Sequence, residues 1–221
     1  MSSTGGSRRD RAGGPERRLL AGGAWAAAVI AGLAVYLRLA QTRAVNSDGA
    51  AQALQAWDLL HGNPLLRGWT TSDVSFYTTE LPQYALVELA RGLRPDVVPT
   101  AAALTYTLAV LLAALLAAGP ARGRAALPPA AAAAGIMLAP QLGSGTNVLL
   151  SSPDHTGTAV PLLLTWLVLD RVRPGWPVPV ITFLSLAWAQ VADSLVLVAG
   201  VIPLAAVCAL RAASRGPAAS A

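Results

Sequence analysis

The succession of long apolar runs limits what this chain can fold into more than any other feature. Residues 98–118 contain no charged side chain, and comparable runs occupy residues 19–40, 125–140, 156–169, 176–191 and 195–210. A helix of about 20 apolar residues is long enough to cross the hydrocarbon core of a bilayer. The sequence therefore predicts an all-α polytopic membrane protein with about six transmembrane helices, several of them short for a spanning helix.

The arginine positions predict which side of the membrane each loop faces. The chain has no lysine, and most of its arginines fall in the tails and turns of one side, at residues 8, 9, 11, 17, 18, 122, 124, 171, 173, 211 and 215. Because cytoplasmic loops are enriched in arginine, we expect this side and the N-terminus to be cytoplasmic, in an inner (plasma) membrane. The net charge of +5 then reflects membrane orientation, and we expect no nucleic-acid partner.

The same pattern divides the chain into a membrane domain and two tails. Residues 1–18 are rich in glycine, serine and arginine and are predicted to be a disordered cytoplasmic tail. Residues 19–211 are the predicted membrane domain, and residues 212–221 are a second cytoplasmic tail. Cys208 is the only cysteine, which excludes an intrachain disulfide and a cysteine metal cluster. We predict no metal-binding residues, although a divalent cofactor stays open, as does the oligomeric state.

The first outer loop, residues 41–97, holds six of the eleven acidic residues. Apolar residues recur near helical spacing from Ala50 to His61, which favours an amphipathic helix at the membrane interface that Gly62 ends. Leu54, Trp57 and Leu60 should face lipid or the bundle. A second surface helix is predicted from Glu80, with Gly92 as its C-terminal stop.

Asp48 is the first candidate for chemistry, because it follows a predicted span and begins a predicted helix. One interpretation is that Asp48 is an ordinary helix N-cap, a position that aspartate favours. The other is a general base at the membrane surface, which takes a proton from an attacking hydroxyl group. The local sequence leaves both open.

Two further outer loops carry ionisable side chains. Asp154 and His155 stand together before a predicted span, where they either bind substrate or mark a helix start. Asp193 lies in the next outer hairpin and is either a turn residue or a partner in the same cavity. Ionisable groups near a membrane are costly to bury without a use, so these acids are candidate substrate-binding residues.

The outer loop resembles that of a known enzyme class in two stretches, Asn46-Ser-Asp-Gly49 and Phe76-Tyr-Thr-Thr-Glu-Leu-Pro-Gln-Tyr84. Residues 19–210 resemble the N-terminal part of the GT-C class of membrane glycosyltransferases, including its protein O-mannosyltransferase-like and aminoarabinose-transferase-like branches. In that class, an acidic residue opens the first outer loop, and interfacial helices carry an aromatic and proline stretch before the second span.

The resemblance implies transfer of a sugar from a polyprenyl-phosphate donor at the outer face, with Asp48 as base. Cationic side chains would hold the lipid phosphate, and the outer candidates are Arg43, His61 and Arg67, with Arg91 and Arg94 beside them. Each arginine is alternatively an interface anchor. Active members of the class are longer than this chain, so a truncated or inactive form stays open beside an active transferase. The alternative is a non-enzymatic membrane protein that binds lipid or assists assembly.

Overall fold

The apolar runs form helices, as predicted. The computed structural model describes residues 14–70, 74–121, 123–138 and 149–214, and these residues contain helices, turns and no strand. Three helical stretches among them are long and apolar enough to cross a membrane. They are Gly22–Gln41 within α1 (Gly14–Gln41), α4 (Val97–Ala118), and Leu197–Ser214, which comprises the π-turn η3 (Leu197–Val201) and α9 (Ile202–Ser214).

The other predicted spans are shorter helices. They are α5 (Leu127–Leu138), which follows the 3₁₀ turn η2 (Gly123–Ala126), α7 (Thr156–Arg171) and α8 (Pro177–Ala192). Pro128 and Pro129 lie in the first turn of α5, where a missing backbone N–H costs little. Much of the predicted outer loop between α5 and α7, residues 139–148, lies outside the described residues.

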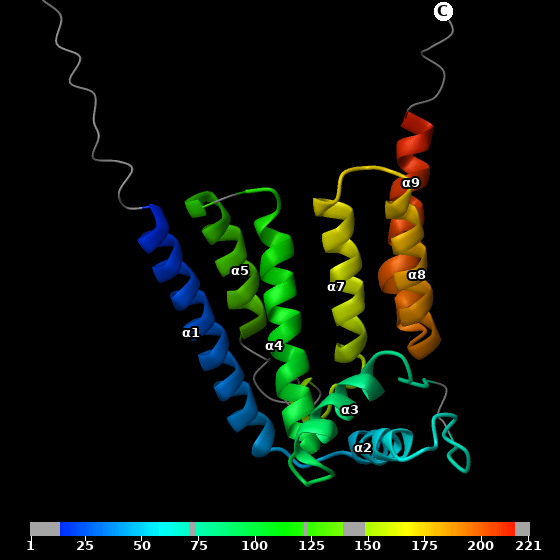
Figure 1. Cartoon of the computed structure of the whole chain (residues 1–221). Helices are drawn as coiled ribbons and strands as arrows, with labels where there is room; N and C mark the ends of the chain where they lie inside the picture. Colours follow the sequence, from blue (N-terminus) through cyan, green and yellow to red (C-terminus); the bar gives the residue numbers. More distant parts are fainter. Residues whose placement is uncertain (1–13, 71–73, 122, 139–148, 215–221) are drawn as a thin grey trace, which may run out of the picture.

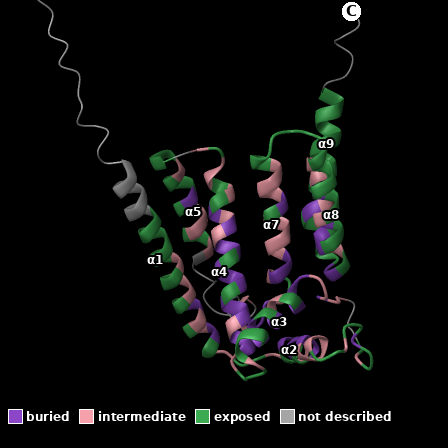
Figure 2. Ribbon diagram, in the orientation of Figure 1, coloured by how far each residue is buried: buried purple, intermediate pink, exposed green. Residues whose placement is uncertain are grey.

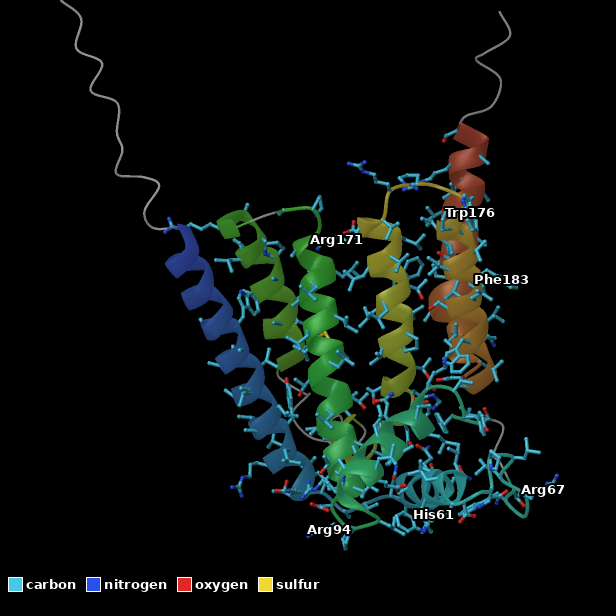
Figure 3. All side chains as sticks on the ribbon, viewed as in Figure 1. His61, Arg67, Arg94, Arg171, Trp176 and Phe183 are labelled. Carbon is cyan, nitrogen blue, oxygen red and sulfur yellow. The ribbon has the colours of Figure 1, made fainter. Side chains whose placement is uncertain are left out.

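The long helices stand side by side, and two helices lie across one end of them (Figure 1). Helix α4 packs against α1, α5 and α7, and α7 packs against α8. The two crossing helices are α2 (Ser47–Leu60) and α3 (Glu80–Arg91), which pack on each other and on α4. We call this part of the molecule the α2–α3 end. Arg171 and Trp176 lie at the opposite end (Figure 3).

Helix boundaries follow local chemistry. Helix α3 ends at Gly92, as predicted, and α4 ends at Gly119; both glycines have positive φ angles that suit residues without a Cβ. Helices extend into both predicted tails. Helix α1 already begins at Gly14, because Pro15 suits a first helical turn, and α9 continues to Ser214. The rest of both tails, residues 1–13 and 215–221, lies outside the described residues.

Burial is concentrated in α4 and at the α2–α3 end (Figure 2). Among the described residues, one core cluster joins α2, α3 and the start of α4, and a second joins α1 to α4. The face of α2 that packs on the rest of the protein holds small and polar residues. Gln52, Ala53 and Ala56 are buried there, whereas Leu54 is exposed, because α2 packs its small residues closely against α3 and α4.

Candidate functional site

At the start of α2, a residue other than Asp48 caps the helix. Asn46 is the N-cap, and its side-chain oxygen accepts a hydrogen bond from the Gly49 N–H at 2.8 Å. Asp48 lies in the first helical turn with its side chain exposed, and the Ser47 hydroxyl donates to its Oδ1 at 3.4 Å. Asp48 is therefore not the cap.

Asp154 joins the segment before α7 to α2. Its carboxylate accepts hydrogen bonds from the Asn46 amide at 3.0 Å, from the Gln52 amide at 2.9 Å, and from the Ser152 hydroxyl. The contact requires close approach, because a Cβ on Gly49 would lie only 2.8 Å from the Ser152 Cβ. Asp154 is not the cap of α7, whose N-cap residue is His155. It connects two segments that lie about 100 residues apart in the sequence.

Glu80 forms a second connection, between α3 and α7. Its side chain is fully buried and accepts hydrogen bonds from the Thr158 backbone N–H at 3.1 Å, from the Thr158 hydroxyl at 3.2 Å, and from Thr79. Burial raises the pKa of Glu80 to about 7, although these hydrogen bonds and the nearby Asp193 also act on it. The α7 backbone can approach because residue 157 is glycine, where a Cβ would lie 2.7 Å from the Glu80 Cγ.

His155 and Asp193 form a third connection, between α7 and α8. The His155 Nδ1 lies 2.7 Å from the Asp193 Oδ2. The Leu195 backbone N–H donates to the other Asp193 carboxylate oxygen at 2.9 Å. Asp193 is buried, whereas about half of the His155 side chain is exposed. A buried carboxylate at one ring nitrogen fixes the orientation of an imidazole, which is how active-site histidines are held.

A polar stripe runs along the buried face of α3. Glu80, Tyr84 and Glu88 follow one another at spacings of one helical turn, and all three are buried. Burial raises the pKa of Glu88 to about 7 and that of Tyr84 well above its usual value. The Glu88 carboxylate oxygens and the Tyr84 hydroxyl make no hydrogen bond with the described residues. Asp154, Glu80 and Glu88 all act electrostatically on Tyr84, so the stripe extends the same acidic cluster.

Of the predicted cationic residues, His61 acts electrostatically on Glu88 of this cluster. Arg43 is half-buried between α1 and α2, and Arg67 is exposed in the turn after α2 (Figure 3). His61 ends α2, where its Nδ1 contacts the Trp57 carbonyl at 2.7 Å and its ring stacks on Trp57. The guanidinium of Arg91 pairs with Asp96 at 2.6 Å, and that of Arg94 approaches the same carboxylate at 3.7 Å. Within the described ranges, no group of acidic, histidine or cysteine residues is arranged to hold a metal ion.

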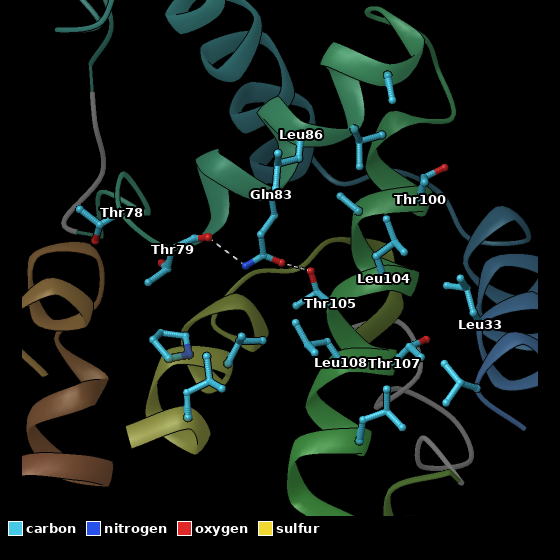
Figure 4. Close-up of a pocket in the computed structure, with 18 of the residues that line it drawn as sticks. Leu33, Thr78, Thr79, Gln83, Leu86, Thr100, Leu104, Thr105, Thr107 and Leu108 are labelled. Carbon is cyan, nitrogen blue, oxygen red and sulfur yellow. Dashed lines mark hydrogen bonds between the residues drawn. The ribbon is translucent and has the colours of Figure 1, made fainter. Parts of the chain in front are cut away.

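A cavity of about 650 Å³ lies against the other face of α3. Its walls come from α1, α3, α4, α7 and α8, and most of the lining side chains are apolar. Gln83 projects from α3 into its polar part, where its amide donates to the Thr79 carbonyl at 2.9 Å and accepts from the Thr105 hydroxyl (Figure 4). The shape and chemistry suit a ligand with a long hydrocarbon part and a small polar head.

The sequence pointed to part of this arrangement. Asp193 was expected to be either a turn residue or a partner of Asp154 and His155 in one cavity. It contacts His155, whereas the Asp154 carboxylate bonds to α2, and the described lining of the cavity includes none of these three residues. Sequence reasoning missed Glu80, Gln52 and Thr158 as members of the cluster. The spacing of Glu80, Tyr84 and Glu88 was the available signal, because polar residues one turn apart share a helix face.

Comparisons of this chain with protein-family models, with curated proteins and with solved structures found no match.

Proposed function

We propose that this chain is an integral membrane protein of the inner membrane that transfers a sugar from a polyprenyl-phosphate donor at the outer face. The cavity beneath α3 carries the proposal, because a mostly apolar space of about 650 Å³ among apolar helices suits the hydrocarbon chain of a lipid. The α2–α3 end then supplies polar and acidic side chains where the lipid chain would end.

The proposal includes six spans, with α5, α7 and α8 crossing the membrane beside the three longer helices. Their lengths of 12, 16 and 16 residues are below the usual length of about 20. Packing against longer neighbours and local thinning of the bilayer make such spans feasible. The arginine pattern supports an outer location for the α2–α3 end and a cytoplasmic N-terminus.

Asp48 is the proposed general base. It would accept the proton of an acceptor hydroxyl while that oxygen bonds to the anomeric carbon and the carbon–oxygen bond to the lipid phosphate breaks, leaving its electron pair on the phosphate. Two observations support this role. The capping function belongs to Asn46, and the Asp48 carboxylate is exposed with a single long hydrogen bond.

A second candidate function is lipid binding without chemistry, as in an assembly protein. The observation that favours it is the composition of the cavity wall, because Asp48 does not line the cavity. Both functions require a bound long-chain lipid, and they differ in whether Asp48 affects a reaction.

Binding of polyprenyl phosphate, measured by native mass spectrometry of protein released from lipid nanodiscs, tests the cavity. Leu108 lines the cavity, and Leu108→Trp should fill it and weaken binding by tenfold or more. The matched control is Leu115→Trp, on the same face of α4 but away from the cavity lining. Equal binding by both variants and the parent protein would remove the basis of the proposal.

A further inference from the structure

Two cavity-lining residues at the start of α3 join the cavity to the buried carboxyl group of Glu80. Thr79 and Gln83 both line the cavity (Figure 4). The Thr79 hydroxyl is hydrogen-bonded to one carboxyl oxygen of Glu80. The Gln83 Nε2 and the Glu80 Cδ each lie 2.8 Å from the point that a Cβ on Gly157 would occupy, so the two side chains are neighbours. Glu80 therefore lies directly behind the polar part of the cavity wall, although it does not line the cavity itself.

The other carboxyl oxygen of Glu80 is bonded to α7. It accepts from the Thr158 backbone N–H at 3.1 Å and from the Thr158 hydroxyl at 3.2 Å. Val160, two residues further along α7, lines the cavity, as does Pro161. Glu80 therefore holds together two of the helices that form the cavity wall.

The groups that contact Glu80 are neutral, and the charge that acts on it is negative. Its hydrogen-bond partners are one backbone amide and two threonine hydroxyls. The charged group that acts on it is Asp193 at the end of α8, which raises its pKa. Among the described residues, no arginine or histidine forms an ion pair with Glu80.

The remaining titratable side chains near α3 come from α3 itself and from the elements packed against it. They are Tyr84, Glu88 and Arg91 of α3, Asp48, Asp58 and His61 of α2, Asp96 and Tyr106 of α4, Asp154 and His155 before α7, and Asp170 and Arg171 at the far end of α7. Because no cation among the described residues is paired with Glu80, an ionised Glu80 carries an unbalanced charge in a buried place.

A ligand in the cavity would change the surroundings of Glu80. Burial raises the pKa of Glu80 to about 7, so both of its forms are populated near neutral pH. A hydrocarbon chain in the cavity would replace water next to Thr79 and Gln83. Removing water from the vicinity of an acid disfavours the ionised form and raises the pKa further. A ligand that raises the pKa of a group binds more tightly to the protonated protein, because the coupling acts in both directions.

We propose that Glu80 is a positioning residue of the lipid cavity, and that its protonated form holds Thr79 and α7 in place around the hydrocarbon chain. Lipid binding is then coupled to the uptake of a proton by Glu80, and the affinity falls as the pH rises and Glu80 ionises. The ligand class is a lipid with a long hydrocarbon chain, whatever its head group. The inference rests on the proposed function, because it requires a lipid in the cavity.

The test measures how pH changes the binding of an uncharged probe, a long-chain polyprenol, to the full chain in nanodiscs of zwitterionic lipid. The range from about pH 5.5 to about pH 8.5 spans the pKa of Glu80. Polyprenol has no group that titrates in this range, so a pH dependence must come from the protein. The dissociation constant should be level at low pH and rise above about pH 7, by about tenfold for each unit by which the lipid raises the pKa of Glu80.

Three variants assign this pH dependence. Glu80→Gln puts a neutral amide in place of the carboxyl group and should bind polyprenol at every pH about as tightly as the parent protein does at low pH. Thr158→Val removes a hydroxyl that favours the ionised form of Glu80, so it should move the midpoint to higher pH. Glu88→Gln is the matched control and should keep the parental profile. Glu88 is a buried carboxyl group two turns further along the same face of α3, and it makes no hydrogen bond with the described residues.

The outcomes separate the two proposals. If polyprenol binds to the parent protein at no pH, the cavity proposal and this inference both fail. If it binds equally across the range, or if Glu88→Gln removes the pH dependence, the inference fails and the lipid cavity stands. A purely structural role of Glu80 predicts that Glu80→Gln weakens binding at every pH and keeps the parental slope, which would also overturn the inference. If Glu80→Gln does not fold, Thr158→Val decides, because an unshifted midpoint in that variant contradicts the role of Glu80.

Discussion

The helical bundle and the α2–α3 end differ most in the charged side chains that they bury, because the buried charged residues among those described, Glu80, Glu88 and Asp193, lie at the α2–α3 end. In the bundle, large apolar side chains such as Phe183, Ile136 and Leu210 are more than two-thirds exposed (Figures 2 and 3). At the α2–α3 end, Glu80, Asp193 and Gln52 are buried. In a water-soluble protein the buried polar groups would be the exception and the exposed apolar surface a liability. The contrast shows that the bundle is suited to an apolar surrounding and that the α2–α3 end is held together by polar contacts.

Those polar contacts are long-range. Asp154 reaches α2, Glu80 reaches α7, and His155 reaches Asp193. Each of these three contacts joins specific partners, so a loss of one partner leaves the other unsatisfied, which costs about 1–3 kcal/mol. The exposed apolar side chains of the bundle do not depend on specific polar partners of this kind. Changes at the α2–α3 end should therefore alter function and stability more than changes on the outer faces of the bundle.

The largest expected effect is on catalysis. Asp48→Asn should lower the rate of sugar transfer from a panel of polyprenyl-phosphate sugars by about 10²–10⁴, the usual contribution of a general base. The variant should unfold like the parent protein, because Asn46 and not Asp48 caps α2. Asp170→Asn, an exposed carboxylate at the opposite end of α7, is the control and should transfer at the parental rate. An Asp48→Asn variant that transfers sugar at the parental rate would show that Asp48 is not the general base, whereas a parent protein that transfers no sugar would favour the non-enzymatic alternative.

The second effect concerns close packing at the α2–α3 end. Gly157→Ala should lower the free energy of unfolding by about 1–3 kcal/mol, because the added Cβ would overlap the Glu80 side chain. Gly135→Ala in α5 meets open space and should stabilise the helix by up to about 1 kcal/mol. Denaturant unfolding in the same detergent measures both. Equal stability of the two variants would mean that α7 does not approach α3 as described.

The third effect is a pH dependence of stability. Burial raises the pKa values of Glu80 and Glu88 from 4.5 to about 7. Between these values the folded chain binds more protons than the unfolded chain, so the free energy of unfolding should fall as the pH rises from about 4.5 to about 7, and these groups should add no further change above that. Thermal unfolding across this range measures the slope, which the double variant Glu80→Gln/Glu88→Gln should flatten. A slope unchanged in the double variant would contradict the burial of these carboxyl groups.

The sequence predicted the helices better than their packing. The apolar runs and the glycine stop at Gly92 gave the elements, because such signals act over a few residues. The face of α2 that packs on α3 and α4 was not predicted, since the pattern placed Leu54, Trp57 and Leu60 against lipid or the bundle without choosing between them, whereas tertiary contacts bury Gln52. The pairing of His155 with Asp193 depends on how α7 and α8 pack, and no local pattern encodes it. The cavity likewise depends on five helices together.

The position of the lipid head group tests the central claim most directly. A polyprenyl phosphate with a photoreactive diazirine next to the phosphate, activated in nanodiscs and followed by mass spectrometry of the peptides, reports the side chains that it contacts. The account predicts crosslinks at the end of the cavity nearest α3, at Thr78, Gln83, Val160 and Trp188. Crosslinks confined to the exposed faces of α8 and η3, such as Phe183 and Val198, would show that the lipid only surrounds the bundle and would contradict the account.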